Sequence, residues 1–228
     1  MVILMEKRTA ILLGSTGLVG HQLLEALIKE EEYGKILVLN RKSIVPGSPK
    51  IEEILTDFSD LQQLESRISG DDLFCCLGTT IKTAKTREKF RQVDYGLPVA
   101  FAEIASRKQV KNFVVISSIG ADAGSRNFYL RTKGEMEQAL IRILGQKVFI
   151  VRPSMLLGKR GEFRFGEEAG KWLTGIVSPL FIGRLARFKG IQASDVARAM
   201  LYTALHGAER QIIESDQLFK LSKIYHHE

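Results

Sequence analysis

Residues 10–31 read AILLGSTGLVGHQLLEALIKEE and contain the clearest structural signal in the sequence. It opens with the apolar run Ala10–Leu13 and continues through glycines at positions 14, 17 and 20. The apolar spacing that follows is typical of an amphipathic helix. Glycine permits a tight turn and a close approach of the backbone to a neighbouring strand or ligand. The stretch therefore predicts a buried strand, a glycine-rich turn and a helix over residues 18–31.

Outward from this stretch, short apolar runs recur at Ile36–Leu39, Leu73–Leu77, Phe113–Ile116 and Val148–Val151. Runs of this kind are typical of strands buried on both faces of a parallel sheet. Helices are predicted between or after them, at residues 59–67, 95–108, 130–144 and 195–207. The alternation of strands and helices predicts an α/β fold with a doubly wound, Rossmann-like parallel sheet, whose ligand site lies at the carboxyl ends of the strands.

Three local features complete the pattern. Ser194 or Asp195 is expected to cap the helix over 195–207. Ile212–Ile213 is a candidate last strand, and Asp94-Tyr95 is expected to cap a helix start.

The glycine turn also predicts dinucleotide binding, because a helix N-terminus offers free N–H donors and a positive dipole to phosphate. The context fits: a strand precedes the turn, a helix follows it, and a second strand ends about 20 residues beyond Gly20. After that strand come Arg41 and Lys42, where an NAD site usually has an acidic residue. Two bases suit the 2′-phosphate of NADP, with a solvated basic turn as the alternative.

The regular alternation stops after Pro153. Residues 154–190 are rich in glycine and carry scattered aromatic residues, so we expect a small irregular cap rather than an independent domain. Four of the aromatic residues either line a substrate pocket or pack the cap onto the sheet: Phe163, Phe165, Trp172 and Phe181. The whole chain, 1–228, is then a single NAD(P)-binding domain with 154–190 as an insertion on the substrate side.

Composition limits the class of protein. With 228 residues, 45% hydrophobic and 26% charged, the chain is an ordinary globular protein. Its only cysteines, Cys75 and Cys76, are adjacent, which suits neither a disulfide nor a metal site and indicates a reducing compartment. We find no secretory signal and no run long enough to span a bilayer, so a cytoplasmic protein without integral membrane association is expected.

The net charge is +7, and the excess of bases lies in the second part of the chain, including the cap. A basic surface attracts an anionic ligand, a membrane or nucleic acid, although a simply solvated surface is commoner. No nucleic-acid motif and no metal constellation is present.

Tyr129 and Lys133 lie four residues apart at the start of a predicted helix, so their side chains share one face. Free tyrosine has a pKa near 10, and a neighbouring ammonium favours tyrosinate. We therefore expect Lys133 and a nicotinamide cation together to lower the pKa of Tyr129. Ser117 and Ser118 end the preceding strand, where a hydroxyl would orient a substrate carbonyl.

At this point the chain resembles the short-chain dehydrogenase/reductase superfamily, most nearly the atypical group around the Tat-interacting tumour-suppressor oxidoreductase. The resemblance rests on N-R-K at 40–42, D-F at 57–58, F-C-C-L-G-T-T at 74–80, S-S-I-G-A-D at 117–122, Y-L-R-T-K-G-E at 129–135 and V-R-P-S-M-L-L at 151–157. It implies a Rossmann-type NADP(H) domain with a Ser-Tyr-Lys site.

The resemblance also implies roles for single residues. The pyrophosphate would be wrapped by Gly14, Ser15, Thr16, Gly17, Leu18, Val19 and Gly20. Arg41 and Lys42 would hold the 2′-phosphate, Asp57 and Phe58 would lie beside the adenine, and Leu77, Gly78 and Thr79 would pass under the nicotinamide ribose. Pro153 would lie near the nicotinamide. Tyr129 would donate the proton, Lys133 would bind the ribose and tune Tyr129, and Ser118, in preference to Ser117, would orient the carbonyl.

The expected function is an NADPH-dependent reductase of a small or medium carbonyl compound, with an anionic substrate favoured by the basic cap. The alternative is a non-catalytic NADP(H)-sensing protein that regulates a protein partner. A peripheral nucleic-acid or membrane binder ranks last. The sequence leaves open the substrate, the stereochemistry of transfer, and the choice between monomer and homodimer.

Overall fold

Seven parallel strands form one sheet in the order β3-β2-β1-β4-β5-β6-β9 in the computed structural model, which describes residues 7–43, 47–158 and 189–227. The strands are β1 (Arg8–Leu13), β2 (Tyr33–Asn40), β3 (Ile51–Leu55), β4 (Asp72–Cys75), β5 (Asn112–Ile116), β6 (Val148–Arg152) and β9 (Ile212–Glu214). Every pairing in the sheet is parallel. The predicted doubly wound, Rossmann-like fold is confirmed.

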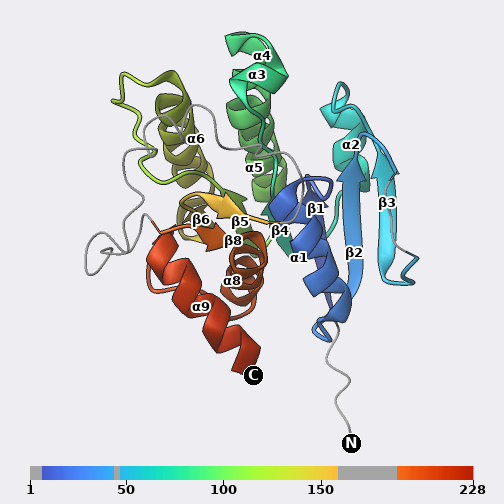
Figure 1. Ribbon diagram of the computed structural model, residues 1–228. Helices are drawn as coiled ribbons and strands as arrows, with labels where there is room; N and C mark the ends of the chain where they lie inside the picture. Colours follow the sequence, from blue (N-terminus) through green and yellow to red (C-terminus); the bar gives the residue numbers. More distant parts are fainter. Residues whose placement is uncertain (1–6, 44–46, 159–188, 228) are drawn as a thin grey trace, which may run out of the picture.

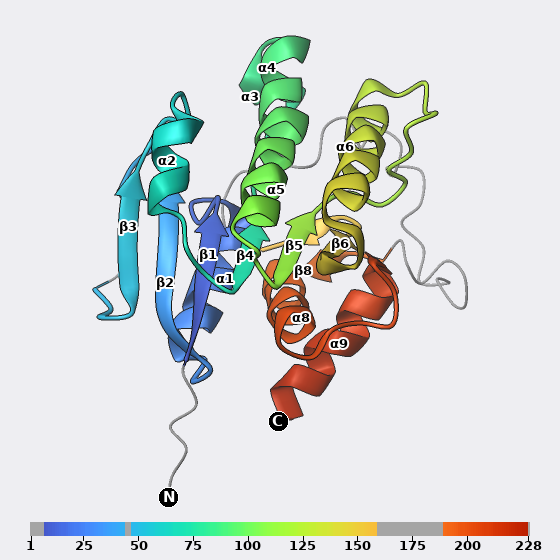
Figure 2. The ribbon, with the colours of Figure 1, turned by 180° about the vertical axis from the view of Figure 1, so that it is seen from behind.

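Helices cover both faces of the sheet (Figures 1 and 2). One face carries α1 (Leu18–Lys29), α8 (Ala193–His206) and α9 (Ser215–His227); the other carries α2 (Leu61–Arg67), α5 (Leu97–Arg107) and α6 (Phe128–Leu144). Alternate residues of β1 divide between the two cores: Ala10 and Leu12 pack under α1 and α8, whereas Ile11 and Leu13 pack under the opposite helices. Burial on both faces explains the unbroken apolar runs of the sequence.

The strand order reverses between β1 and β4, the two strands that start the two halves of the sheet. In doubly wound sheets ligands bind at this switch point, outside the carboxyl ends of the strands. The glycine turn after β1 and the Leu77–Thr79 segment after β4 both lie there.

The edge strand β3 and the last helix, α9, were not predicted. Glu52 and Glu53 interrupt the apolar pattern of β3, which an edge strand tolerates because it pairs on one side only. Glu52 forms an ion pair with Lys35 of β2 at 2.6 Å. The N-cap of α8 is Gln192, without a side-chain hydrogen bond, so the predicted cap at Ser194 or Asp195 is wrong.

Between β4 and α5 the chain is helical for most of its length. It forms α3 (Ile81–Ala84), α4 (Arg87–Arg91) and a wide π-type turn, η1 (Gln92–Gly96), which leads directly into α5. The N–H of Leu97 donates to the carbonyl of Gln92, five residues back, and Pro98 follows. A wide turn of this kind often marks a functional position in a helix.

At the amino ends of the strands, opposite the glycine turn, the first residues of four strands form a polar cluster. We call it the amino-edge cluster, and its members are Arg8, Tyr33, Asp72 and Asn112. The fully buried Asp72 carboxylate accepts hydrogen bonds from Arg8 at 2.6 and 2.7 Å, from the Tyr33 hydroxyl at 2.7 Å and from the Asn112 amide at 2.8 Å. Each carboxylate oxygen therefore has two donors, as a buried charge requires.

Two short strands, β7 (Leu156–Leu157) and β8 (Ile191–Gln192), pair in parallel and bracket the predicted cap. Residues 159–188, including the four candidate aromatic residues Phe163, Phe165, Trp172 and Phe181, lie outside the described residues. In the described ranges we find no helix that is long and apolar enough to cross a membrane.

Candidate active site

The glycine turn is packed too closely to accept side chains. Gly14 has a φ of +81°, and a Cβ there would lie 2.7 Å from the carbonyl oxygen of Cys76. A Cβ on Gly20 would lie 2.1 Å from the carbonyl oxygen of Gly14. The first turn of α1 thus rests directly on the loop that follows β1, which itself touches the end of β4.

The start of α1 has the chemistry of an anion site. Its N-cap, Gly17, provides no side-chain hydrogen bond, and the first turn contains no acidic residue. The amide donors of that turn therefore have no side-chain acceptor at the cap, and the helix dipole favours a negative charge. Together with the close-packed glycines, these features fit the pyrophosphate of a dinucleotide.

The other predicted residues of the turn point in different directions. Ser15 is fully buried, and its hydroxyl donates to Asn40 Oδ1 at 2.7 Å, so only its backbone faces the turn. Thr16 is exposed, and Val19 packs in the core. Leu18 lies against Gly158, where a Cβ would approach its Cδ1 to 2.7 Å, so the predicted cap leaves the sheet beside the glycine turn.

Arg41 and Lys42 follow β2 as exposed side chains, one residue after the buried Asn40. The amide of Asn40 also donates to Glu53 Oε1 at 3.0 Å, which fixes the end of β2 against β3. This placement brings two cations to the edge of the sheet nearest the glycine turn.

Asp57 and Phe58 follow β3 and take opposite orientations. The exposed Asp57 carboxylate accepts the Ser59 N–H at 2.9 Å, and hydrogen bonds from Ser59 lower its pKa. Phe58 has a φ of +65°, and its ring packs edge-on against Phe101 in the core with centroids 5.8 Å apart. Its side chain is therefore part of the core, and only its backbone can face an adenine.

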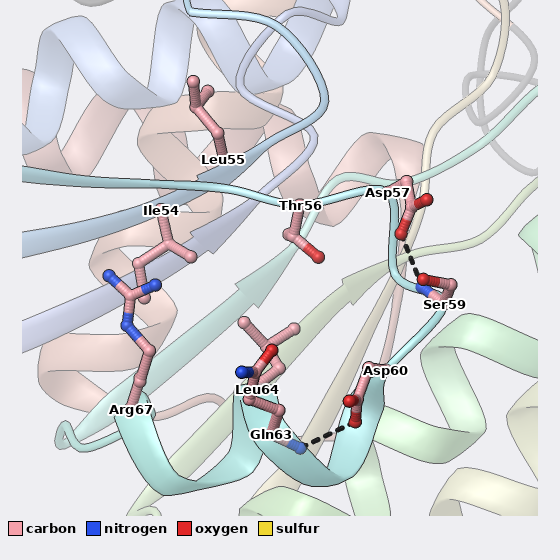
Figure 3. Close-up of a pocket in the computed structure, with 9 residues that line it drawn as sticks. All are labelled: Ile54, Leu55, Thr56, Asp57, Ser59, Asp60, Gln63, Leu64 and Arg67. Carbon is pink, nitrogen blue, oxygen red and sulfur yellow. Dashed lines mark hydrogen bonds between the residues drawn. The ribbon is translucent and has the colours of Figure 1, made fainter.

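A hollow of about 270 Å³ opens beside Asp57, between the end of β3 and the start of α2 (Figure 3). It is lined by Ile54, Leu55, Thr56, Asp57, Ser59, Asp60, Gln63, Leu64 and Arg67. Ser118, Tyr129 and Lys133 do not line it, so this hollow is not the place of the chemistry.

Tyr129 lies in the first turn of α6, whose N-cap Asn127 accepts the Leu130 N–H at 3.2 Å. Lys133 follows one turn later and is almost fully buried. Ser118 lies just beyond β5, where its hydroxyl donates to the Ile119 carbonyl at 3.3 Å and is close enough to the Tyr129 phenol to act to lower its pKa. The structure therefore brings the three predicted catalytic side chains together. The gap of 11 residues between Ser118 and Tyr129, a little shorter than in well-known superfamily members, does not separate them.

Ser117, the neighbouring serine, points away from this group. It is buried, and its hydroxyl donates to Glu137. Pro153, buried just after β6, accepts the N–H of Ile119 through its carbonyl at 3.1 Å, which joins the end of β6 to the loop after Ser118.

Asp94 is the residue that sequence reasoning missed. It is fully buried in η1, and its Oδ1 lies 2.9 Å from Lys133 Nζ, while its Oδ2 accepts the Thr79 N–H at 2.9 Å. The expected helix cap at Asp94-Tyr95 is wrong, because the residue lies inside a continuous helical segment. The sequence contained one signal for a buried role of Asp94, an acidic residue one turn before Pro98 where a mostly apolar helix begins.

Asp94 also orders the predicted cofactor segment after β4. Leu77 and Thr79 are half-buried and Gly78 is exposed, and the backbone of Thr79 is held by the Asp94 carboxylate. One carboxylate thus contacts both the segment expected under the nicotinamide ribose and the lysine expected to bind that ribose.

Burial and mutual electrostatic interaction determine the pKa values of Lys133 and Asp94. Loss of water acts to lower the pKa of Lys133, but the pKa is raised overall because Asp94 and Tyr129 stabilise the ammonium. Lys133 also donates to the Ile116 carbonyl at 3.4 Å. Burial raises the pKa of Asp94, against the opposing effects of Lys133 and the Thr79 amide.

The pKa of Tyr129 is set by opposing influences within the protein. Burial raises it above the usual 10, although Lys133 and the Ser118 hydroxyl both act to lower it. The sequence showed the neighbouring ammonium but not the loss of water around the phenol. At neutral pH Tyr129 therefore keeps its proton, which suits a proton donor.

Comparison with known proteins agrees with this geometry. Residues 14–206 match the family model described as NAD(P)H-binding. The chain belongs to this NAD(P)H-binding family. Its Rossmann-type fold agrees with this membership.

Relatives that span nearly the whole chain carry the name "Protein FMP52, mitochondrial". The protein of that name from Meyerozyma guilliermondii is 36% identical over 95% of this chain and 96% of its own length. The one from Lodderomyces elongisporus is 31% identical over 90% of each chain. These relatives do not point specifically to the Tat-interacting group. The comparisons therefore support the NAD(P)H-binding family and not that narrower group.

Solved structures share the fold at low sequence identity. The oxidoreductase ylbE from Lactococcus lactis superposes with a TM-score of 0.66 at 19% identity, over 96% of this chain and 99% of that one. UDP-glucose 4-epimerase from Thermotoga maritima gives a TM-score of 0.67 at 17% identity, over 96% and 83%.

The expected cytoplasmic location is wrong, because the relatives that match most of the chain are named as mitochondrial proteins. Cys75 and Cys76 are both free in the structure.

Proposed function

We propose that this protein is an NADPH-dependent oxidoreductase that reduces the carbonyl group of a small or medium substrate. The observation that carries the proposal is the convergence of Ser118, Tyr129, Lys133 and Asp94 at the carboxyl edge of the sheet, next to a glycine turn that fits a pyrophosphate.

NADPH, when bound, supplies the hydride. Gly14–Gly20 would hold its pyrophosphate through backbone N–H groups, and Lys133 would bind the nicotinamide ribose while its ammonium stays paired with Asp94. Arg41 and Lys42 would form charge-assisted hydrogen bonds with the 2′-phosphate, and this is the basis for preferring NADPH to NADH.

The chain's own residues account for the proton transfer. The Ser118 hydroxyl donates a hydrogen bond to the substrate carbonyl oxygen and orients it beside the Tyr129 phenol. Tyr129 releases its proton to that oxygen as negative charge develops there. The Lys133 ammonium stabilises the resulting tyrosinate, and Asp94 keeps that ammonium in place for this role.

An anionic substrate is supported by the surface around Tyr129. Helices α3 and α4 stand above the carboxyl ends of the strands (Figure 1). Together with the link between them they expose five basic side chains and one acidic one, Glu88, and one of the bases, Arg91, forms an ion pair with Glu135 of α6. The five are Lys82, Lys85, Arg87, Lys89 and Arg91. Arg87 and Arg131 also lie against the ring of Phe128, the residue before Tyr129, with their Cζ atoms 5.1 and 5.8 Å from its centroid.

The test is consumption of NADPH with a panel of aldehydes and ketones that includes carboxylated and phosphorylated members. The proposal expects turnover, with the anionic members preferred at low salt. NADPH binding without turnover of any member would instead favour the alternative of an NADP(H)-sensing protein with a protein partner.

A further inference from the structure

A second buried polar cluster lies between α6 and the carboxyl ends of β5, β6 and β9; we call it the Glu137 cluster. Arg152 donates to both oxygens of the buried Glu137 carboxylate, through Nε at 2.9 Å and through Nη2 at 2.5 Å. The Ser117 hydroxyl donates to the same carboxylate. Helix α6 is thus tied to the ends of two strands through one side chain.

The Arg152 guanidinium makes two further contacts. Its Nη2 donates to the carbonyl of Ala121 at 3.0 Å, and its Nη1 donates to Glu214 Oε1 at 3.1 Å. Ala121 belongs to the loop that joins Ser118 to Tyr129. One planar group therefore holds that loop, α6 and the end of β9 in fixed relation, which a fork of N–H donors does better than a single ammonium.

The spacing along the chain links this cluster to the candidate active site. Tyr129, Lys133 and Glu137 follow one another at intervals of four, so they share one face of α6. Ser117 and Ser118 are adjacent: the Ser117 hydroxyl donates to Glu137 of that face, and the Ser118 hydroxyl lies close enough to Tyr129 of the same face to act to lower the pKa of its phenol. Fixing the first contact fixes the position of α6 along the end of β5, and hence the second contact.

We propose that Glu137 and Arg152 are positioning residues that hold the Ser118 hydroxyl against the Tyr129 phenol; the catalytic meaning of this contact rests on the proposed function. A buried ion pair is a weak source of stability, since the cost of removing both charges from water offsets much of their attraction. The hydrogen bonds that it directs to Ser117 and Ala121 are specific in geometry.

The experiment compares Arg152→Lys, Glu137→Gln and Ser117→Ala with the wild-type protein. Arg8→Lys is the matched control, because Arg8 forms the same two-pronged pair with a buried carboxylate at the opposite edge of the sheet. The first readout is the alkaline titration of Tyr129, followed by tyrosinate absorbance as the difference from Tyr129→Phe. It needs no substrate, and Lys133 and Asp94, the charged groups that act on this phenol, stay intact in every variant.

Loss of the Ser118 contact removes one influence that lowers the pKa of Tyr129. We therefore expect the Tyr129 titration to move upward by about half a unit to one unit in the three cluster variants. In Arg8→Lys we expect no shift. The second readout is turnover: kcat should fall at least about tenfold with the affinity for NADPH unchanged, since a displacement of about 1 Å is costly in catalysis.

A folded Arg152→Lys or Glu137→Gln protein with the wild-type Tyr129 titration would overturn the proposal. If both fail to fold, Ser117→Ala decides, because it removes one hydroxyl and leaves the ion pair. Absence of turnover in the wild-type protein would contradict the proposed function, while the titration would still decide the positioning role.

Discussion

Two buried carboxylates, one at the amino ends of the strands and one beside their carboxyl ends, show how similar residues take different roles. Asp72 of the amino-edge cluster and Asp94 of the candidate active site are both fully buried, and each pairs with a base, Arg8 and Lys133. Asp72 is surrounded by donors on both oxygens. Asp94 holds a lysine whose other neighbour, Tyr129, is only partly buried.

The difference lies in where the chain of contacts ends. The amino-edge contacts join the first residues of four strands and a carbonyl of α8, so all the polar partners in this cluster are groups of the protein. The contacts of Asp94 lead through Lys133 to Tyr129 and Ser118 at the switch point of the sheet. Buried charges that lead outward to a partly exposed titratable group are typical of functional sites.

The largest effect is expected from Tyr129→Phe. It removes the donated proton but leaves the ring packed against Phe90, so kcat should fall by about 10²- to 10⁴-fold while NADPH affinity and the thermal midpoint stay close to wild type. Steady-state kinetics with calorimetry of NADPH binding measures this. Undiminished turnover would show that Tyr129 is not the donor.

The two carboxylates themselves give the next contrast. Asp72→Asn leaves Arg8 without its counter-charge, and we expect a loss of about 3–5 kcal/mol in the free energy of unfolding with kcat retained in the folded protein. Asp94→Asn should lower kcat as well, by about tenfold or more, because the Lys133 ammonium loses its anchor. Denaturant unfolding and kinetics, each done on both variants, separate the two roles. Equal effects of the two substitutions on kcat would contradict the comparison.

A smaller effect is expected for the cofactor preference. Reversing both charges in Arg41→Glu/Lys42→Glu should weaken NADPH binding by about tenfold or more, by removing the partners of the 2′-phosphate. NADH binding, which lacks that phosphate, should change little. Lys220→Glu/Lys223→Glu, which reverses two exposed charges on α9, is the control for the same change in net charge. Equal losses for both cofactors would remove the assignment of these two residues.

The smallest effect concerns pH. Because the pKa of Tyr129 is raised above 10, the phenol stays protonated through the neutral range, and reduction should be nearly independent of pH there. The rate should fall only as the pH rises through the raised pKa, while the reverse oxidation, which needs tyrosinate, should increase over the same range. Ser118→Ala should move both changes to higher pH. A decline of the reductive rate near neutrality would place the controlling group elsewhere.

The sequence was sufficient for the features that depend on local chemistry. The glycine turn, the apolar runs of the central strands and the Tyr129–Lys133 spacing all predicted what the structure contains. Their common property is that a short segment carries the whole signal, because a buried strand or a close-packed glycine restricts its own residues.

The remaining features depend on contacts between distant segments. Asp94 lies 39 positions from Lys133, and nothing near Asp94 showed that a buried ammonium would face it. The resemblance favoured Ser118 over Ser117, but the physical reason for the difference lies in Glu137 and Tyr129, which belong to a helix formed later in the chain. The edge strand β3 was missed because Glu52 and Glu53 interrupt the apolar run that marks the other, buried strands.

The proposed function is tested most directly by a calorimetric titration of the protein with NADPH and, in parallel, with NADH. We expect tight binding of NADPH and clearly weaker binding of NADH, because the glycine turn would receive the pyrophosphate of both cofactors, whereas Arg41 and Lys42 would meet only the 2′-phosphate of NADPH. If neither cofactor bound at sub-millimolar concentration, the glycine turn would serve packing alone, and the proposed reductase would be contradicted.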